Sequence, residues 1–178
     1  MKFYKKLPFL LISLVILSCS ESNEDDLVKK AGAPLLKGLG THNHTVSTKN
    51  AAAQRYFNQG LVLSFAFNHA ESIRSFKASQ RLDPNCAMCY WGEALSRGPN
   101  INVTSDGKVV MSDSDRVEAF KAIEKAKELM HSASLKEQDY INALSSRYNG
   151  KVGTDRNLLD RKYAESMEVL SNKYPEDM

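Results

Sequence analysis

Apolar and small residues between positions 53 and 86 recur at intervals of three or four, which is the spacing of one face of an α-helix. They fall into two sets on either side of a break at 67–69: Tyr56, Gly60 and Leu63, then Ser72, Phe76 and Ser79. Small residues on both faces let two helix backbones approach closely, and the Phe76 ring fills the remaining space. Proline at position 84 ends the pair. The pattern therefore predicts a helical hairpin, whose second helix Asn68 and Glu71 are spaced to cap.

The same periodicity predicts further helices. A second unit begins at Asn85, with Ala94 in the place of Gly60. It is interrupted at 98–113, where Asp106-Gly107 between two β-prone runs predicts a turn with two short strands. Helices are then predicted over 115–132, over 134–148 behind a capping box that starts at Ser134, and over 155–173. We expect an all-α protein of helical hairpins with one loop or hairpin insertion.

Five positions in the first hairpin resemble the tetratricopeptide repeat, whose period of about 34 residues the unit shares. They are Gly60, Leu63, Phe76, Leu82 and Pro84. The chain departs from the family at Ser72 and Ser79, where alanine is usual. The resemblance implies a short right-handed α-solenoid over 49–178. Because the last residues, 174–178, resemble the turn between repeats, we expect this repeat domain to be C-terminally incomplete.

The first 19 residues resemble a bacterial lipoprotein signal. Three lysines precede the apolar run 9–17, which is too short to span a bilayer, and 16–19 resembles a lipobox ending at Cys19. The resemblance implies removal of 1–18, acylation of Cys19, a lipid-anchored linker over 19–48, and an envelope location at the outer membrane. An ordinary secretory signal cleaved nearby is the alternative. The polar, acidic stretch at 20–30 predicts a solvated tether that keeps the folded body off the membrane; alternatively, it resembles the acidic tracts that direct lipoproteins to the cell surface.

The charge of the chain argues against nucleic acid as a partner. The chain has 24 basic and 21 acidic residues, and Lys2, Lys5 and Lys6 account for the difference. The part after the signal is therefore neutral overall, and no basic stripe is present that would neutralise phosphates. We expect no nucleic-acid binding.

The repeat resemblance also implies a binding site. In tetratricopeptide arrays the first helix of each hairpin lines a concave groove that binds protein segments. The matching positions here are Gln54, Phe57, Leu61, Phe65, Met88, Trp91 and Leu95. An aromatic patch on this groove would bind another envelope protein, with Trp91 as a hot spot. The alternative is that the N-terminal segment or further repeats bury these side chains.

Histidine and cysteine pairs indicate a second possible function. His42 and His44 lie on one side of an extended chain, and His69 in a helix first turn could face them, giving a candidate transition-metal site. Cys86 and Cys89 form a Cys-x-x-Cys at a helix start, which fits a local structural disulfide, a redox couple, reduced core thiols or part of a metal site.

These observations lead to two hypotheses. The first is a lipid-anchored envelope protein that acts as a protein-interaction scaffold and needs no cofactor. The second is a metal-binding or redox-active envelope protein that uses the three histidines and two cysteines. Because no nucleophile motif, phosphate loop or dinucleotide fingerprint occurs, we do not expect an enzyme in this stretch of chain.

Overall fold

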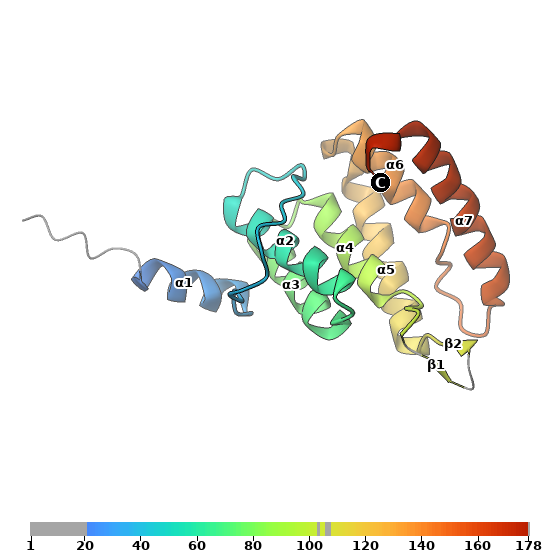
Figure 1. Ribbon diagram of the computed structural model, residues 1–178, viewed down its shortest axis with the longest axis horizontal. Helices are drawn as coiled ribbons and strands as arrows, with labels where there is room; N and C mark the ends of the chain where they lie inside the picture. The colour runs from blue at the N-terminus through green and yellow to red at the C-terminus, as the bar shows by residue number, and fades with distance from the viewer. Residues whose placement is uncertain (1–20, 103, 106–107, 178) are drawn as a thin grey trace, which may run out of the picture.

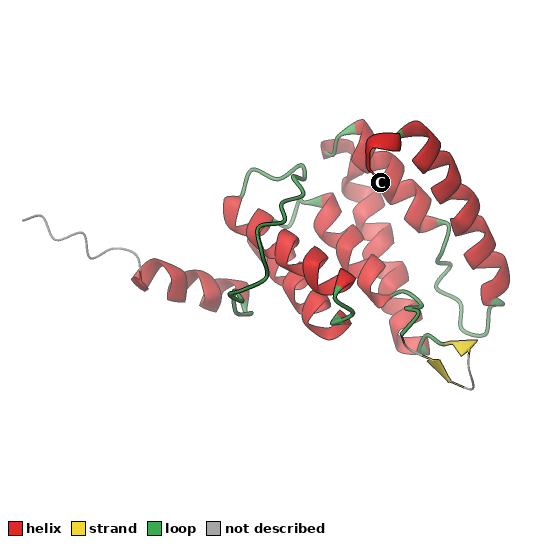
Figure 2. Cartoon of the chain, viewed as in Figure 1, coloured by secondary structure: helices red, strands yellow, loops and turns green. Residues whose placement is uncertain are grey.

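The computed structural model describes residues 21–102, 104–105 and 108–177. The signal segment and Cys19 lie outside these residues, as does the Asp106-Gly107 turn. The elements are α1 (Glu21–Ala31), α2 (Ala51–Phe65), α3 (His69–Leu82), α4 (Ala87–Arg97), β1 (Thr104–Ser105), β2 (Lys108–Val109), α5 (Asp113–Leu129), η1 (Met130–Ser132), α6 (Leu135–Ser145), α7 (Arg156–Lys173) and η2 (Pro175–Asp177). The described chain is all-α apart from the two-residue strands, which pair antiparallel (Figure 2).

Consecutive helices from α2 to α7 pack against one another along the molecule (Figure 1). In addition, α2 contacts α4 and α4 contacts α6, so the first helices of three successive pairs are neighbours. None of the helices in the described ranges is both long enough and apolar enough to cross a membrane.

Phe76, on α3, packs between α2 and α4. Its side chain is fully buried, and its ring contacts the ring of Phe57 edge-on at a centroid distance of 5.4 Å. A Cβ atom at Gly60 or at Gly92 would lie within 3 Å of the ring. The ring therefore occupies space that both α2 and α4 leave by having glycine at these positions.

Ser72 and Ser79 are hydrogen-bonded across the α2–α3 interface. Ser72 Oγ donates to the Gly60 carbonyl at 2.6 Å, and Ser79 Oγ donates to the Ala53 carbonyl at 2.7 Å. Both serines are fully buried, and a buried hydroxyl without such a partner would be unfavourable. They are small enough to pack as alanine does and also tie the two helices together.

One predicted helix cap is present and another is not. The capping box at Ser134 and Glu137 is present, and Asp155, predicted as the first residue of the last helix, is the N-cap of α7. Asn68 occupies the N-cap position of α3, but its side chain makes no capping hydrogen bond. Its backbone N–H instead donates to the Leu63 carbonyl as part of the end of α2, and Phe67 before it has a left-handed φ of +59°. The predicted capping role of the Asn68 side chain is therefore wrong.

Candidate functional site

An extended segment before α2 covers one side of the helices. We call residues 33–50 the strap; it follows α1 and leads directly into α2, whose first turn Asn50 caps (Figure 1). The sequence predicts a lipid-anchored linker over 19–48. In the structure, residues 21–31 of this stretch form a helix, and the strap that follows is hydrogen-bonded to the folded body.

Two glutamines of α2 bind the strap backbone in the same way. Gln54 Oε1 accepts from the Val46 N–H at 3.0 Å, and its Nε2 donates to the His44 carbonyl at 2.8 Å. Gln59 Oε1 accepts from the Leu36 N–H at 2.7 Å, and its Nε2 donates to the Pro34 carbonyl at 3.0 Å. A side-chain amide has both a donor and an acceptor, so each glutamine satisfies an N–H and a C=O that a neighbouring β-strand would otherwise satisfy.

Asn58 extends this row of amides. Its Oδ1 accepts from the His44 N–H at 3.2 Å, and its Nδ2 donates to Asn43 Oδ1 at 2.7 Å. With Gln54 and Gln59 it forms one polar edge of α2 that faces the strap backbone. Of these three residues, the sequence pointed only to Gln54.

Glu137 binds the strap from the other side, at the start of α6. Its Oε1 accepts from the Ser47 N–H at 2.6 Å, and its Oε2 accepts from the Ser47 hydroxyl. Ser47 and Glu137 are 90 positions apart in the sequence. The strap therefore connects the first helix of the first hairpin to the first helix of the third.

Side chains of the strap alternate between the two sides of the segment. His44, Val46, Thr48 and Asn50 are buried or half-buried, whereas Asn43, Thr45, Ser47 and Lys49 are exposed. This period of two is the geometry of an extended strand. Val46 is the most buried of them, with 5% of its surface exposed, and it belongs to the main hydrophobic core together with Phe57, Leu61 and Met88.

The strap thus closes much of the groove that the sequence predicts. Phe57, Leu61 and Met88 are 0%, 5% and 3% exposed, so these three are not available to a partner while the strap is in place. Phe65 is 70% exposed, at the last turn of α2. Trp91 is half-buried and packs against Tyr140. Its Nε1 donates to the Tyr140 carbonyl at 3.2 Å, and its ring meets the Tyr140 ring edge-on. Beside the strap remains a cavity of about 310 Å³, lined by residues 44–47, Met88 and the first turns of α6.

The structure does not bring the three histidines together. His69 Nε2 is hydrogen-bonded to Asn102 Oδ1 at 2.8 Å, near the β-hairpin. His44 lies over the Phe57 ring at a centroid distance of 6.1 Å, and burial lowers its pKa below the ordinary value of 6.5. His42 lines a different cavity, between the strap and α2. Within the described ranges, no group of three or more histidine, cysteine, aspartate or glutamate side chains is arranged to hold a metal ion.

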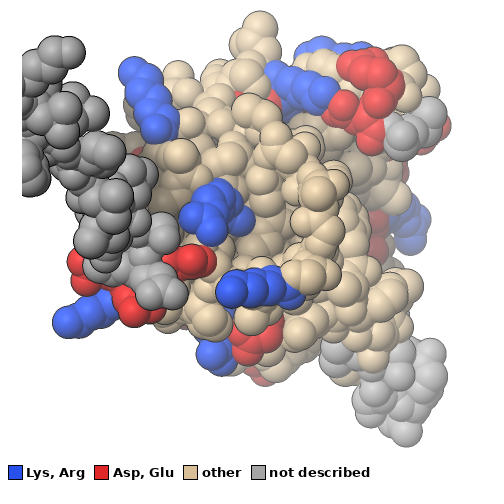
Figure 3. Space-filling model, turned by 60° about the vertical axis from the view of Figure 1, so that its left-hand side comes forward, with Lys and Arg blue, Asp and Glu red and all other residues tan. Residues whose placement is uncertain are grey.

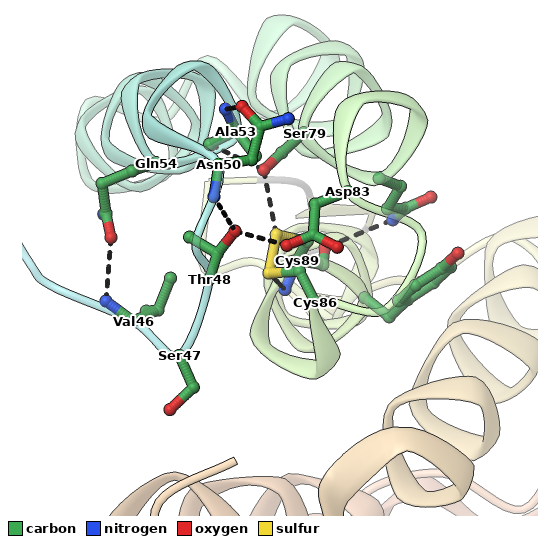
Figure 4. The surroundings of a disulfide bond; sticks show 12 residues. Val46, Ser47, Thr48, Asn50, Ala53, Gln54, Ser79, Asp83, Cys86 and Cys89 are labelled. Atoms are coloured by element: carbon green, nitrogen blue, oxygen red, sulfur yellow. Dashed lines mark hydrogen bonds between the residues drawn. A yellow bond between two sulfur atoms is a disulfide. The ribbon is translucent and has the colours of Figure 1, made fainter. Parts of the chain in front are cut away.

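Cys86 and Cys89 are joined by a disulfide at the start of α4, close to the strap residues 46–48 (Figure 4). Both cysteines are fully buried and belong to the same core cluster as Val46. Cys86 is the N-cap of α4, and its sulfur accepts from the Cys89 N–H at 3.2 Å. Above it, the Thr48 hydroxyl donates to Asp83, so the strap is hydrogen-bonded to the turn that leads to the disulfide.

Charged side chains are spread over the surface. On the face drawn in Figure 3, lysines and arginines lie apart from one another, with acidic groups between them and uncharged residues over most of the area. Several exposed ion pairs join residues one helical turn apart, such as Lys121 with Glu118 at 2.8 Å. Pairs of this kind contribute little to stability.

Comparisons of the chain with protein-family models, with curated proteins and with solved structures found no match. The function of the site is therefore argued from its own geometry.

Proposed function

We propose that this chain is a protein-interaction module of tetratricopeptide-like hairpins, lipid-anchored at Cys19 in the bacterial envelope, that binds an extended protein segment on the face formed by α2, α4 and α6. One observation carries the proposal. The strap lies on this face in an extended conformation, and the side chains of Gln54, Gln59 and Glu137 bind its backbone groups. Contacts to backbone groups suit any segment that is extended, in the way that strand addition does.

The strap is thus the internal occupant of a peptide site, and a partner segment binds by replacing part of it. Three features support this view. Between 43 and 47 the strap has no helix or sheet hydrogen bonds of its own. Of the side chains at 43–47, Val46 alone is buried in the core, and a cavity remains beside it. Loops with few buried apolar contacts are the segments that open most easily.

The test uses the full chain with Cys19→Ala, to remove acylation, and Val46→Asp, to open the strap by placing a charge in the core. A fluorescein-labelled peptide of residues 41–50 should bind this variant, with fluorescence anisotropy as the measurement. Adding Gln54→Leu should weaken binding at least about tenfold, because two hydrogen bonds to the peptide backbone are lost. Adding Asn142→Leu, which alters an exposed amide of α6 away from the strap, should leave the affinity unchanged.

Equal binding by the two variants, or no binding by the opened chain, would contradict the proposal. The anchor is tested separately by incorporation of labelled palmitate, which Cys19→Ala should abolish.

A further inference from the structure

The folded body binds side chains of the strap as well as its backbone, and these side-chain contacts are selective. We infer that the partner segment of this site has a β-branched apolar residue followed directly by two hydroxyl residues, the chemistry of Val46-Ser47-Thr48, and that the strap is an internal competitor of that segment. This inference rests on the proposed function and specifies its partner.

The first hydroxyl position is selected by Glu137. One carboxylate oxygen accepts the Ser47 N–H at 2.6 Å and the other accepts the Ser47 hydroxyl. Serine and threonine have a hydroxyl donor close to their own N–H, as these two bonds require, whereas alanine and other apolar residues cannot make the second bond. Glu137 is 7% exposed, and an acidic side chain at this position would place a second negative charge against it.

The second hydroxyl position is selected by Asp83. The Thr48 hydroxyl donates to Asp83 Oδ2, while the other oxygen of Asp83 accepts the Asn85 N–H at 3.1 Å. Asp83 follows the end of α3, and Glu137 is in the first turn of α6. Two carboxylates from different parts of the fold thus accept hydroxyls from adjacent residues of one extended segment, although adjacent side chains point to opposite sides of it.

The apolar position is selected by the core. Val46 packs into the cluster that contains Phe57, Met88 and the disulfide. A small β-branched side chain suits an extended backbone there, and a polar or charged one would be buried without compensation.

The strap also makes the site self-occupied. Only Lys49 separates Thr48 from the N-cap of α2, so the strap is present at the high effective concentration of a short tether. A partner segment therefore binds only when the strap is open.

The experiment compares three labelled peptides of residues 41–50 on the full Cys19→Ala chain that also carries Val46→Asp. They are the natural sequence, the peptide with Ser47→Ala and Thr48→Ala, and the peptide with Val46→Asp. The matched control chain carries Thr45→Asp, which adds the same charge at the neighbouring exposed position. If Val46→Asp prevents folding, as judged by far-UV circular dichroism, a chain with Ser47→Ala and Thr48→Ala replaces it, because Ser47 is exposed and Thr48 is half-buried.

We expect the natural peptide to bind the opened chain at least about tenfold more tightly than either altered peptide, and the Thr45→Asp chain to bind no better than the unsubstituted one. Opening is measured independently as the rate at which a water-soluble phosphine reduces the Cys86–Cys89 disulfide. Equal binding of the three peptides would overturn this inference and leave the proposed function standing. No binding by a chain whose disulfide has become reducible would overturn both. A concentration-dependent dimer of the opened chain, with no peptide binding, would show that a second copy is the occupant and would also overturn the inference.

Discussion

Replacing Gly92 by alanine should destabilise the protein, although alanine favours helices more than glycine does. A Cβ atom at position 92 would lie 2.2 Å from Phe76 Cε1, and two further ring atoms would lie within 2.5 Å of it. Because non-bonded carbons prefer separations of about 3.5–4.0 Å, the ring would have to move by more than about 1 Å. It has little room to do so, since Phe76 is fully buried and Gly60 approaches its other side.

The expected size follows from two opposing effects. Overpacking a core costs about 1–3 kcal/mol, and the severity of this contact places Gly92→Ala at the upper end. Alanine in place of glycine inside a helix contributes about 1 kcal/mol in the other direction. We therefore expect the free energy of unfolding to fall by about 2 kcal/mol.

The assay is urea unfolding of the full chain, followed by circular dichroism. Gly60→Ala is the matched control: its nearest ring contact would be 2.9 Å, so the two effects should nearly cancel. Phe76→Leu should remove most of the penalty, giving a coupling of at least about 1 kcal/mol in a double-mutant cycle. If Gly92→Ala were as stable as the unsubstituted chain, or if its effect simply added to that of Phe76→Leu, the close packing of α4 on Phe76 would be refuted.

Three further perturbations test other parts of the structure. Phe67→Gly should raise the free energy of unfolding by about 0.5–1 kcal/mol in the same assay, because Phe67 has a φ of +59°, which favours glycine, and its side chain is 53% exposed. A lower stability would mean that the ring makes a stabilising contact. Cys86→Ala with Cys89→Ala should lower the free energy of unfolding by about 2 kcal/mol, the contribution expected from loop-closure entropy for a disulfide between residues three positions apart. A reductant should then have no further effect on the urea midpoint of this variant. Burial lowers the pKa of His44 in the folded state, so the unfolded state binds more protons below pH 6.5, and the free energy of unfolding should fall as the pH is lowered from 7 to 5. His44→Gln should show a smaller fall, and an equal fall would assign the effect to other groups.

The helices could be predicted because their signals are local. The three- and four-residue spacing of Tyr56, Gly60 and Phe76 with their neighbours gave the first hairpin, and Ser134 with Glu137 gave the start of α6. Serine at position 72 was expected to act as a small residue only. Its hydrogen bond to the Gly60 carbonyl depends on how two helices meet, which spacing alone does not specify.

The strap could not be predicted in the same way. Both of its alternating sets contain polar residues, so the hydropathy of the sequence shows no strand there, and its partner Glu137 lies 90 positions away. The groove was predicted from the repeat register, which indicates the lining positions and says nothing about what covers them. A row of amides at 54, 58 and 59 was the one signal in the sequence that α2 binds an extended backbone, and only its first member was identified.

Strap opening should change the affinity for a partner peptide and the rate of disulfide reduction by the same factor. If opening costs about 3 kcal/mol, the site is open in about one molecule in 150, and the apparent Kd of a partner peptide rises by the same factor. A reductant that reaches the fully buried Cys86 and Cys89 only through the open state is slowed by that factor too. The factor by which the peptide Kd of the unsubstituted chain exceeds that of the opened chain should therefore equal the factor by which its disulfide is reduced more slowly. Unequal ratios would mean that the peptide and the reductant enter through different openings, and that the strap is not what closes the site.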